Sequence, residues 1–160
     1  MKLPLWKVNL FVKLFGLAKI PLVFFCGPKF VEFDQNRCVV KIKLGYRTKN
    51  HLNSMYFGAL AVGAELSVAA AAVFAIQQKK QRIDFLFKDF QCQFLKRAEG
   101  DVLFVCEEVP LVSELIEKAS NSSERLETTL KGYAYVPSKG KEPVISYQLT
   151  LSVKNRQSKS

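Results

Sequence analysis

A lone carboxylate lies in the most apolar segment of the chain, the 22 residues from Met55 to Ile76. This carboxylate is Glu65, and its neighbours are mostly alanine, valine, leucine and glycine. Loss of hydration disfavours the charged form of a carboxyl group, so these surroundings should raise the pKa of Glu65 toward the range useful for proton transfer. Glu65 is therefore the first candidate for a chemical role, and a structural acid paired with a lysine or with backbone is the alternative.

The start of the same segment offers hydrogen-bond donors suited to carbonyl chemistry. If a helix begins at Phe57 and Gly58, their backbone N–H groups have no partner within the helix and carry partial positive charge. Such donors can stabilise the negative charge that develops on a carbonyl oxygen under attack. Glu65 follows two turns later, about 12 Å along the axis, so one helix cannot place both groups on one carbonyl.

The helix that carries these groups is long and apolar enough to raise the question of a membrane span. A central acid costs at least about 2.5 kcal/mol on insertion, and the segment is rich in alanine and glycine, which add little insertion energy. The segments that follow are charged and alternating, as in a sheet. We therefore expect a buried helix, enclosed by a sheet that curls around it, and no membrane span.

Alternating apolar residues predict the sheet itself. One strand is expected within 37–48 and another within 82–98, where the alternation slips near Lys88 and Asp89 and indicates a bulge. Further strands are expected within 101–109, 125–137 and 142–154, with a helix over 112–119 between them.

The N-terminal segment predicts a helix over about 5–17, followed by a strand within 20–34 that a turn interrupts at Gly27-Pro28. A membrane-surface helix is the alternative for 5–17. Residues 155–160 are expected to form a loose tail, and the whole chain, 1–160, reads as one domain because it has neither repeats nor a linker. One apolar face is expected on the first helix, formed by Trp6, Leu10, Phe11, Leu14 and Phe15.

Composition narrows the class of site. The chain has 49% hydrophobic residues, 24 basic and 14 acidic side chains, and a net charge of +10, which favours anionic partners. The four cysteines form no C-x-x-C pair and His51 is the only histidine, so we expect no metal site, reduced thiols and a cytoplasmic protein. No recognition motif supports nucleic-acid binding.

The stretch 49–65, KNHLNSMYFGALAVGAE, resembles the helix motif of the hotdog-fold acyl-CoA thioesterase superfamily. In the branch similar to the phenylacetate-pathway thioesterase, an Asn is followed six residues later by His-Gly-Gly, and an Asp or Glu stands nine residues after that His. Asn50, the triplet Tyr56-Phe57-Gly58 and Glu65 stand at these positions. A bacterial branch with the pattern RNHxGSxHxGAL is closer still. The departures are Tyr56 for the His, Phe57 for the first Gly, and Asn53 for a Gly before the helix.

The resemblance implies an α+β hotdog fold, an antiparallel sheet wrapped around one long central helix. It implies hydrolysis of acyl thioesters, chiefly acyl-CoA, by a homodimer or homotetramer without a cofactor. The oxyanion donors of Phe57 and Gly58 then belong to one subunit, while Glu65 of the other activates water or attacks the thioester. Asn50 would orient the water or the acyl carbonyl, although it also suits a simple turn or helix-entry role.

In this superfamily the nucleotide phosphates of the substrate lie at the protein surface. Basic residues after the central helix and after the following strand are candidates for contacting them, with solvated surface positions as the alternative. Tyr56 either lines the mouth of the pocket or only packs. A non-catalytic hotdog protein that binds acyl chains or acyl thioesters is the alternative function. The candidate phosphate-binding residues are Lys79, Lys80, Arg82, Lys96 and Arg97.

Overall fold

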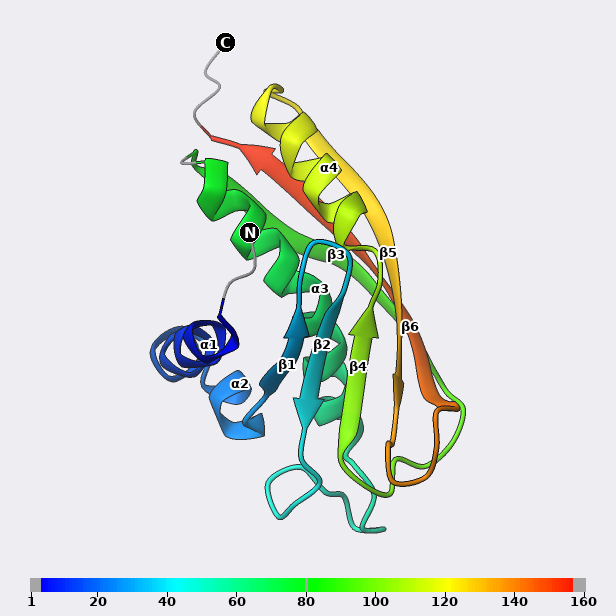
Figure 1. The fold of residues 1–160 in the computed structure, drawn as a ribbon. Helices are drawn as coiled ribbons and strands as arrows, with labels where there is room; N and C mark the ends of the chain where they lie inside the picture. Colours follow the sequence, from blue (N-terminus) through cyan, green and yellow to red (C-terminus); the bar gives the residue numbers. More distant parts are fainter. Residues whose placement is uncertain (1–3, 80, 157–160) are drawn as a thin grey trace.

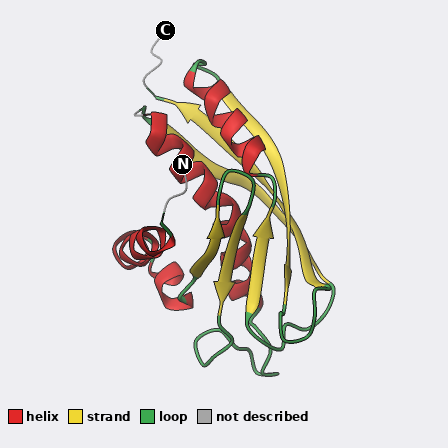
Figure 2. Cartoon of the chain, in the orientation of Figure 1, coloured by secondary structure: helices red, strands yellow, loops and turns green. Residues whose placement is uncertain are grey.

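The computed structural model describes residues 4–79 and 81–156 and contains an antiparallel sheet of six strands (Figure 1). The strands follow the order β1-β2-β4-β5-β6-β3. Helices α3 and α4 pack against the sheet, whereas α1 and α2 stand beside β1 (Figure 2). The strands are β1 Lys29–Phe33, β2 Cys38–Ile42, β3 Ile83–Phe94, β4 Val102–Cys106, β5 Arg125–Tyr135 and β6 Pro143–Asn155. The helices are α1 Leu5–Lys19, α2 Pro21–Cys26, α3 Phe57–Lys79 and α4 Val109–Ser120.

Helix α3 is the central element that the sequence predicts. It packs on β2, β4 and β5 and against α4, and 61% of its most apolar window is buried, so packing within the protein accounts for a helix long enough to cross a membrane. Gly63 permits a close approach to β4, because a Cβ there would lie 2.2 Å from Cε2 of the buried Phe104. The long central helix and the antiparallel sheet confirm the α+β hotdog fold.

The two edges of the sheet differ in how they are covered. At β1, the Asn9 side chain of α1 accepts a hydrogen bond from the Phe30 N–H at 2.7 Å and donates one to the Phe30 carbonyl at 3.0 Å. At the other edge, β3 pairs only with β6 among the described strands. The register of that pair shifts between Phe87 and Asp89, which confirms the predicted bulge. The outer edge of β3 therefore remains open to a further strand.

The segment within 20–34 corrects the sequence prediction. Residues Pro21–Cys26 form helix α2 rather than the first part of a strand. Pro21 starts this helix with a φ that suits the first turn, and Gly27 ends it with φ 62°, a left-handed conformation that favours glycine. The strand begins only at Lys29.

Helix α1 extends over the predicted N-terminal helix but packs through another stripe. Val8 is buried, Leu5 and Val12 pack beside it, and Asn9 reaches β1. The helix is apolar around most of its circumference, so hydrophobicity alone does not select the packed stripe, whereas the hydrogen bonds of Asn9 do. The apolar face expected from the sequence is exposed instead: Trp6, Leu10, Phe11, Leu14 and Phe15.

The C-terminal end is structured further than the sequence suggests. Strand β6 reaches Asn155, whose side-chain amide donates to the Ser120 carbonyl at 3.2 Å. Arg156 forms an ion pair with Asp84 at 2.7 Å. The rest of the expected loose tail, residues 157–160, lies outside the described residues.

Candidate active site at the start of helix α3

Helix α3 begins at Phe57, as the motif predicts. The Leu60 N–H donates to the Tyr56 carbonyl at 3.1 Å, so the N–H groups of Phe57 and Gly58 precede the hydrogen-bond ladder of the helix. Phe57 is 60% exposed and Tyr56 is 48% exposed. The donor end of the helix is therefore accessible from solvent.

Two aromatic rings flank this helix start. The ring centroids of Tyr56 and Phe57 are 4.8 Å apart. A Cβ at Gly58 would lie 2.7 Å from Cε1 of Tyr56, so glycine at this position lets the tyrosine ring lie over the first turn. The rings narrow the approach to the N–H donors without removing them.

The loop before the helix is held together by Asn50. Its Oδ1 accepts hydrogen bonds from the N–H groups of Leu52 at 2.9 Å and Ser54 at 3.2 Å, and its Nδ2 donates to Ser54 Oγ at 3.1 Å. Asn53 has φ 60°, a left-handed conformation that asparagine tolerates better than most residues. Asparagine can therefore replace the glycine of the related motif. A role for Asn50 in orienting water or substrate stays a prediction. His51 also lies in this loop and is exposed.

A cavity of about 370 Å³ opens beside the helix start. Its walls come from the loop before α3, the first turn of α3, and the end of β3 with the segment that follows. The cavity brings together four residues that the sequence analysis names as candidates. One of them, Lys96, also forms an ion pair with Glu142. The predicted residues are Asn50, Phe57, Lys96 and Arg97, and the lining is completed by Ser54, Met55, Leu60, Phe94, Leu95 and Ala98.

Glu65 lies outside this cavity, on an exposed part of α3. Ala61 stands midway between Phe57 and Glu65, four residues from each, so the three residues share one face of the helix. Although the Glu65 side chain is open to solvent, the surrounding protein removes enough water to raise the pKa of its carboxyl group. Among the described residues no ion pair or side-chain hydrogen bond engages it. The direction of the pKa shift agrees with the sequence prediction, whereas full burial does not occur in the single chain.

The candidate phosphate-binding residues divide between the two ends of α3. Lys96 and Arg97 line the cavity near its start. Lys79 is at the other end, about 33 Å away along the axis, where it forms an ion pair with Glu117. Arg82 is exposed just before β3, and Lys80 lies outside the described residues. One chain therefore does not bring all these cations to one phosphate group.

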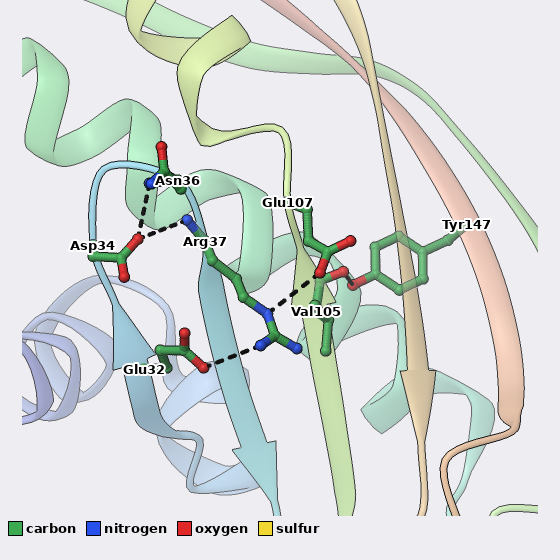
Figure 3. Close-up of polar contacts among 7 residues, drawn as sticks. All are labelled: Glu32, Asp34, Asn36, Arg37, Val105, Glu107 and Tyr147. Carbon is green, nitrogen blue, oxygen red and sulfur yellow. Dashed lines mark hydrogen bonds and ion pairs between the residues drawn. The ribbon is translucent and has the colours of Figure 1, made fainter.

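Two polar clusters have no counterpart in the sequence analysis (Figure 3). The Tyr147 hydroxyl lies 3.2 Å from the Val105 carbonyl oxygen and 2.8 Å from Ser67 Oγ, and burial raises its pKa well above the ordinary value. This group ties α3, β4 and β6 together and is closed to solvent.

The second cluster belongs to the β1–β2 hairpin. The Arg37 guanidinium forms ion pairs with Glu32 at 3.4 Å and Glu107 at 3.6 Å, and Asp34 accepts hydrogen bonds from the N–H groups of Asn36 and Arg37 (Figure 3). No motif marks these residues in the sequence, because only the folded hairpin brings them together. The sequence analysis likewise did not identify the apolar cavity residues Phe94 and Leu95, because the alternating pattern assigns them to the end of a strand.

Solved structures share this architecture. A protein of unknown function from Chlorobaculum tepidum aligns with a TM-score of 0.78 at 12% identity, over 94% of this chain and 96% of that chain. A Pseudomonas aeruginosa protein described as a probable thioesterase aligns with a TM-score of 0.75 at 21% identity, over 98% and 99% of the two chains. A Haemophilus influenzae thioesterase aligns with a TM-score of 0.71 at 13% identity, over 97% and 93%. At these identities the similarity establishes the hotdog fold.

Sequence comparison adds a family. A search of curated proteins finds no match. Residues 9–153 match the family described as Domain of unknown function (DUF4442), and this range extends from α1 to β6. The chain therefore belongs to the DUF4442 family.

Proposed function

We propose that this protein hydrolyses acyl thioesters, chiefly acyl-CoA, at a site that two copies of the chain complete together. The observation that carries the proposal is the placement of Glu65. This carboxylate is exposed, has a raised pKa and shares one helix face with the free N–H groups at Phe57, yet it lies too far along the helix to reach the same carbonyl. A second helix running in the opposite direction removes that separation.

The open edge of β3 supports such an assembly. A two-fold pairing of β3 with its counterpart would continue the sheet across both subunits and satisfy the unpaired backbone groups. It would also cover apolar side chains that a single chain leaves exposed at this edge, including Leu86, Phe90 and Phe94. The β1 edge is already occupied by Asn9, which favours β3 as the pairing edge.

Helix α3 suggests where the two-fold axis passes. If the two copies of α3 cross in antiparallel fashion at Ala61, Phe57 of one subunit faces Glu65 of the other, because each lies four residues from the crossing point. The small side chain of Ala61 permits close contact of the two helices. A dimer built this way has two equivalent sites, and a tetramer would pair two such dimers.

The chemistry at each site then follows from these groups. The thioester carbonyl oxygen accepts hydrogen bonds from the N–H groups of Phe57 and Gly58, which stabilise the oxyanion as it forms. Glu65 of the other subunit takes a proton from water, and the hydroxide oxygen bonds to the carbonyl carbon. When the carbon–sulfur bond breaks, the thiolate recovers that proton. A raised pKa makes Glu65 a stronger base than an ordinary carboxylate, and Asn50 would help to orient the water.

The same two-fold symmetry gathers the basic residues. Because β3 is about 36 Å long and its partner runs in the opposite direction, Lys79 and Arg82 of one subunit would approach the cavity of the other. They would join Lys96 and Arg97 around the phosphates of coenzyme A, in keeping with the net charge of +10. The free state of all four cysteines supports a cytoplasmic location.

A panel of acyl thioesters with short, long and aromatic acyl groups tests the proposal. Wild-type protein should hydrolyse at least one of them, and Glu65→Gln should lower kcat by about 100-fold or more, as loss of a general base does. Glu124→Gln, which changes an exposed glutamate on the loop before β5, is the matched control and should leave kcat unchanged. Equal turnover by wild type and Glu65→Gln would contradict the assignment.

A non-catalytic acyl-thioester-binding protein is the second candidate, and the aromatic rings of Tyr56 and Phe57 beside the donor N–H groups favour it. Under that alternative, wild-type protein binds the thioesters without turnover. Replacement of Phe57 by glycine, the residue of the related motif, would then change affinity without producing hydrolysis.

A further inference from the structure

Helix α1 presents an unusually apolar outer face. The stripe containing Val8 and Val12 packs on the rest of the protein, and the opposite side is left open. Trp6 is 65% exposed, and Leu10, Leu14 and Leu17 are exposed beside it. Exposed single apolar side chains are common, but several contiguous ones on one short helix usually mark a binding surface.

Helix α2 extends this surface. Leu22 is 60% exposed, and Phe25 is exposed with the Arg47 guanidinium 5.6 Å from its ring centroid. Both helices stand beside β1 (Figures 1 and 2), and β1 lies at the opposite end of the strand order from the open edge of β3. The surface is therefore separate from the edge that the proposed dimer would use.

The charge on this surface selects its partner. Lys7, Lys13 and Lys19 are exposed and have no ion-pair partner among the described residues, and residues 1–31 contain five lysines but neither aspartate nor glutamate. A second copy of the same face would bring lysine against lysine. An anionic lipid surface instead accepts both features, because leucine and tryptophan enter the headgroup boundary while lysines extend along it to the phosphates.

We propose that α1 and α2 form a membrane-surface element, which seats the protein on bilayers that contain anionic phospholipids. The element lies in the plane of the surface, with the apolar face of α1 toward the acyl chains. The inference is independent of the proposed hydrolysis, since it uses neither α3 nor the cavity. Its failure would leave the active-site assignment unchanged.

Trp6 provides the probe, because it is the only tryptophan in the chain. Full-length protein is titrated with vesicles of phosphatidylcholine alone and of phosphatidylcholine mixed with phosphatidylglycerol, and Trp6 emission is recorded together with co-sedimentation. We expect a blue shift and sedimentation with the mixed vesicles only. The combined change Lys7→Gln, Lys13→Gln and Lys19→Gln should weaken that binding by about 100-fold.

The apolar contribution is tested separately. Leu10→Ser with Leu14→Ser keeps Trp6 as the probe and should weaken binding to the mixed vesicles by about tenfold or more. The matched control is Leu52→Ser with Leu111→Ser, which removes two exposed leucines elsewhere and should bind as wild type does. Circular dichroism checks that each variant keeps its helices.

Three results would overturn the proposal. The first is the absence of an emission shift of wild type on the mixed vesicles, even if the face captures an acidic protein instead. The second is unchanged vesicle binding by the Leu10→Ser, Leu14→Ser variant. The third is a smaller oligomer of the Leu10→Ser, Leu14→Ser variant than of wild type, measured by light scattering, with vesicle binding unchanged. That result would identify the face as a contact between copies of the chain.

Discussion

Gly63 is the point where the central helix touches the sheet, and its replacement by alanine has a calculable cost. The added Cβ would lie 2.2 Å from Cε2 of Phe104 and 2.4 Å from Cζ. An ordinary carbon–carbon contact is about 3.5 Å, so the ring or the helix must move by about 1.3 Å. Phe104 has no exposed surface, so the cost should lie in the upper part of the range for overpacking, about 2–3 kcal/mol. Alanine regains about 1 kcal/mol through its higher helix propensity.

The net expectation for Gly63→Ala is a loss of about 1–2 kcal/mol in the free energy of unfolding. For a chain of this size that corresponds to a fall in Tm of about 2–8 °C, measurable by thermal or urea unfolding. Gly45→Ala is the control, because nothing lies within 4 Å of the added Cβ, and it should stay within about 1 kcal/mol of wild type.

A second background isolates the contact itself. Phe104→Val removes the ring atoms that meet the new Cβ and leaves a cavity, so Gly63→Ala should be neutral or stabilising in that background. If Gly63→Ala were as stable as wild type, or equally destabilising with and without the ring, the close approach of α3 to β4 would not be the reason for glycine at this position.

Three further predictions concern Glu65, Asn9 and Asn53. Because the pKa of Glu65 is raised in the folded protein, ionisation of this carboxyl group lowers the stability of the fold at pH values above the ordinary pKa of 4.5. Glu65→Gln should therefore raise Tm at neutral pH, and the gain should disappear as the pH falls below 4.5. A gain in Tm that stays constant across this pH range would contradict the prediction. Asn9→Leu leaves the buried Phe30 N–H and carbonyl unpaired and should cost about 2 kcal/mol in urea unfolding; an unchanged midpoint would exclude the edge-covering role. Because Asn53 has φ 60°, Asn53→Gly should be tolerated, whereas Asn53→Val should lose about 1–2 kcal/mol in the same assay, and equal stability of the two variants would refute the backbone argument.

Local periodicity was sufficient for most of the sheet and for the central helix. The slip of alternation near Lys88 and Asp89 located the bulge in β3, since one extra residue reverses which side chains face the core. Periodicity was insufficient to predict α2, because the five apolar residues between Pro21 and Gly27 fit a strand as well as a short helix. There the proline and the left-handed glycine are the better guides.

The candidate site was likewise predicted only in part from the sequence. The spacing from Asn50 to Glu65 anticipated the start of α3 and the loop before it. It left open whether Asn50 acts on the substrate or only in the turn, and the structure shows the Asn50 side chain bonded within its own loop. The sequence also could not show how the candidate phosphate-binding residues are grouped in space. Lys79 and Arg82 lie near one end of α3 and β3, whereas Lys96 and Arg97 lie near the other.

The decisive measurement is subunit complementation. Phe57→Pro removes one oxyanion donor, and proline is well tolerated at the first position of a helix; Glu65→Gln removes the base. Each variant alone should be nearly inactive. When the two are co-assembled in equal amounts, half of the dimers are mixed, and one site in each mixed dimer keeps both Phe57 and Glu65, so activity should recover to about one quarter of wild type. No recovery, with mixed dimers demonstrated by mass spectrometry, would mean that the two subunits do not share the site.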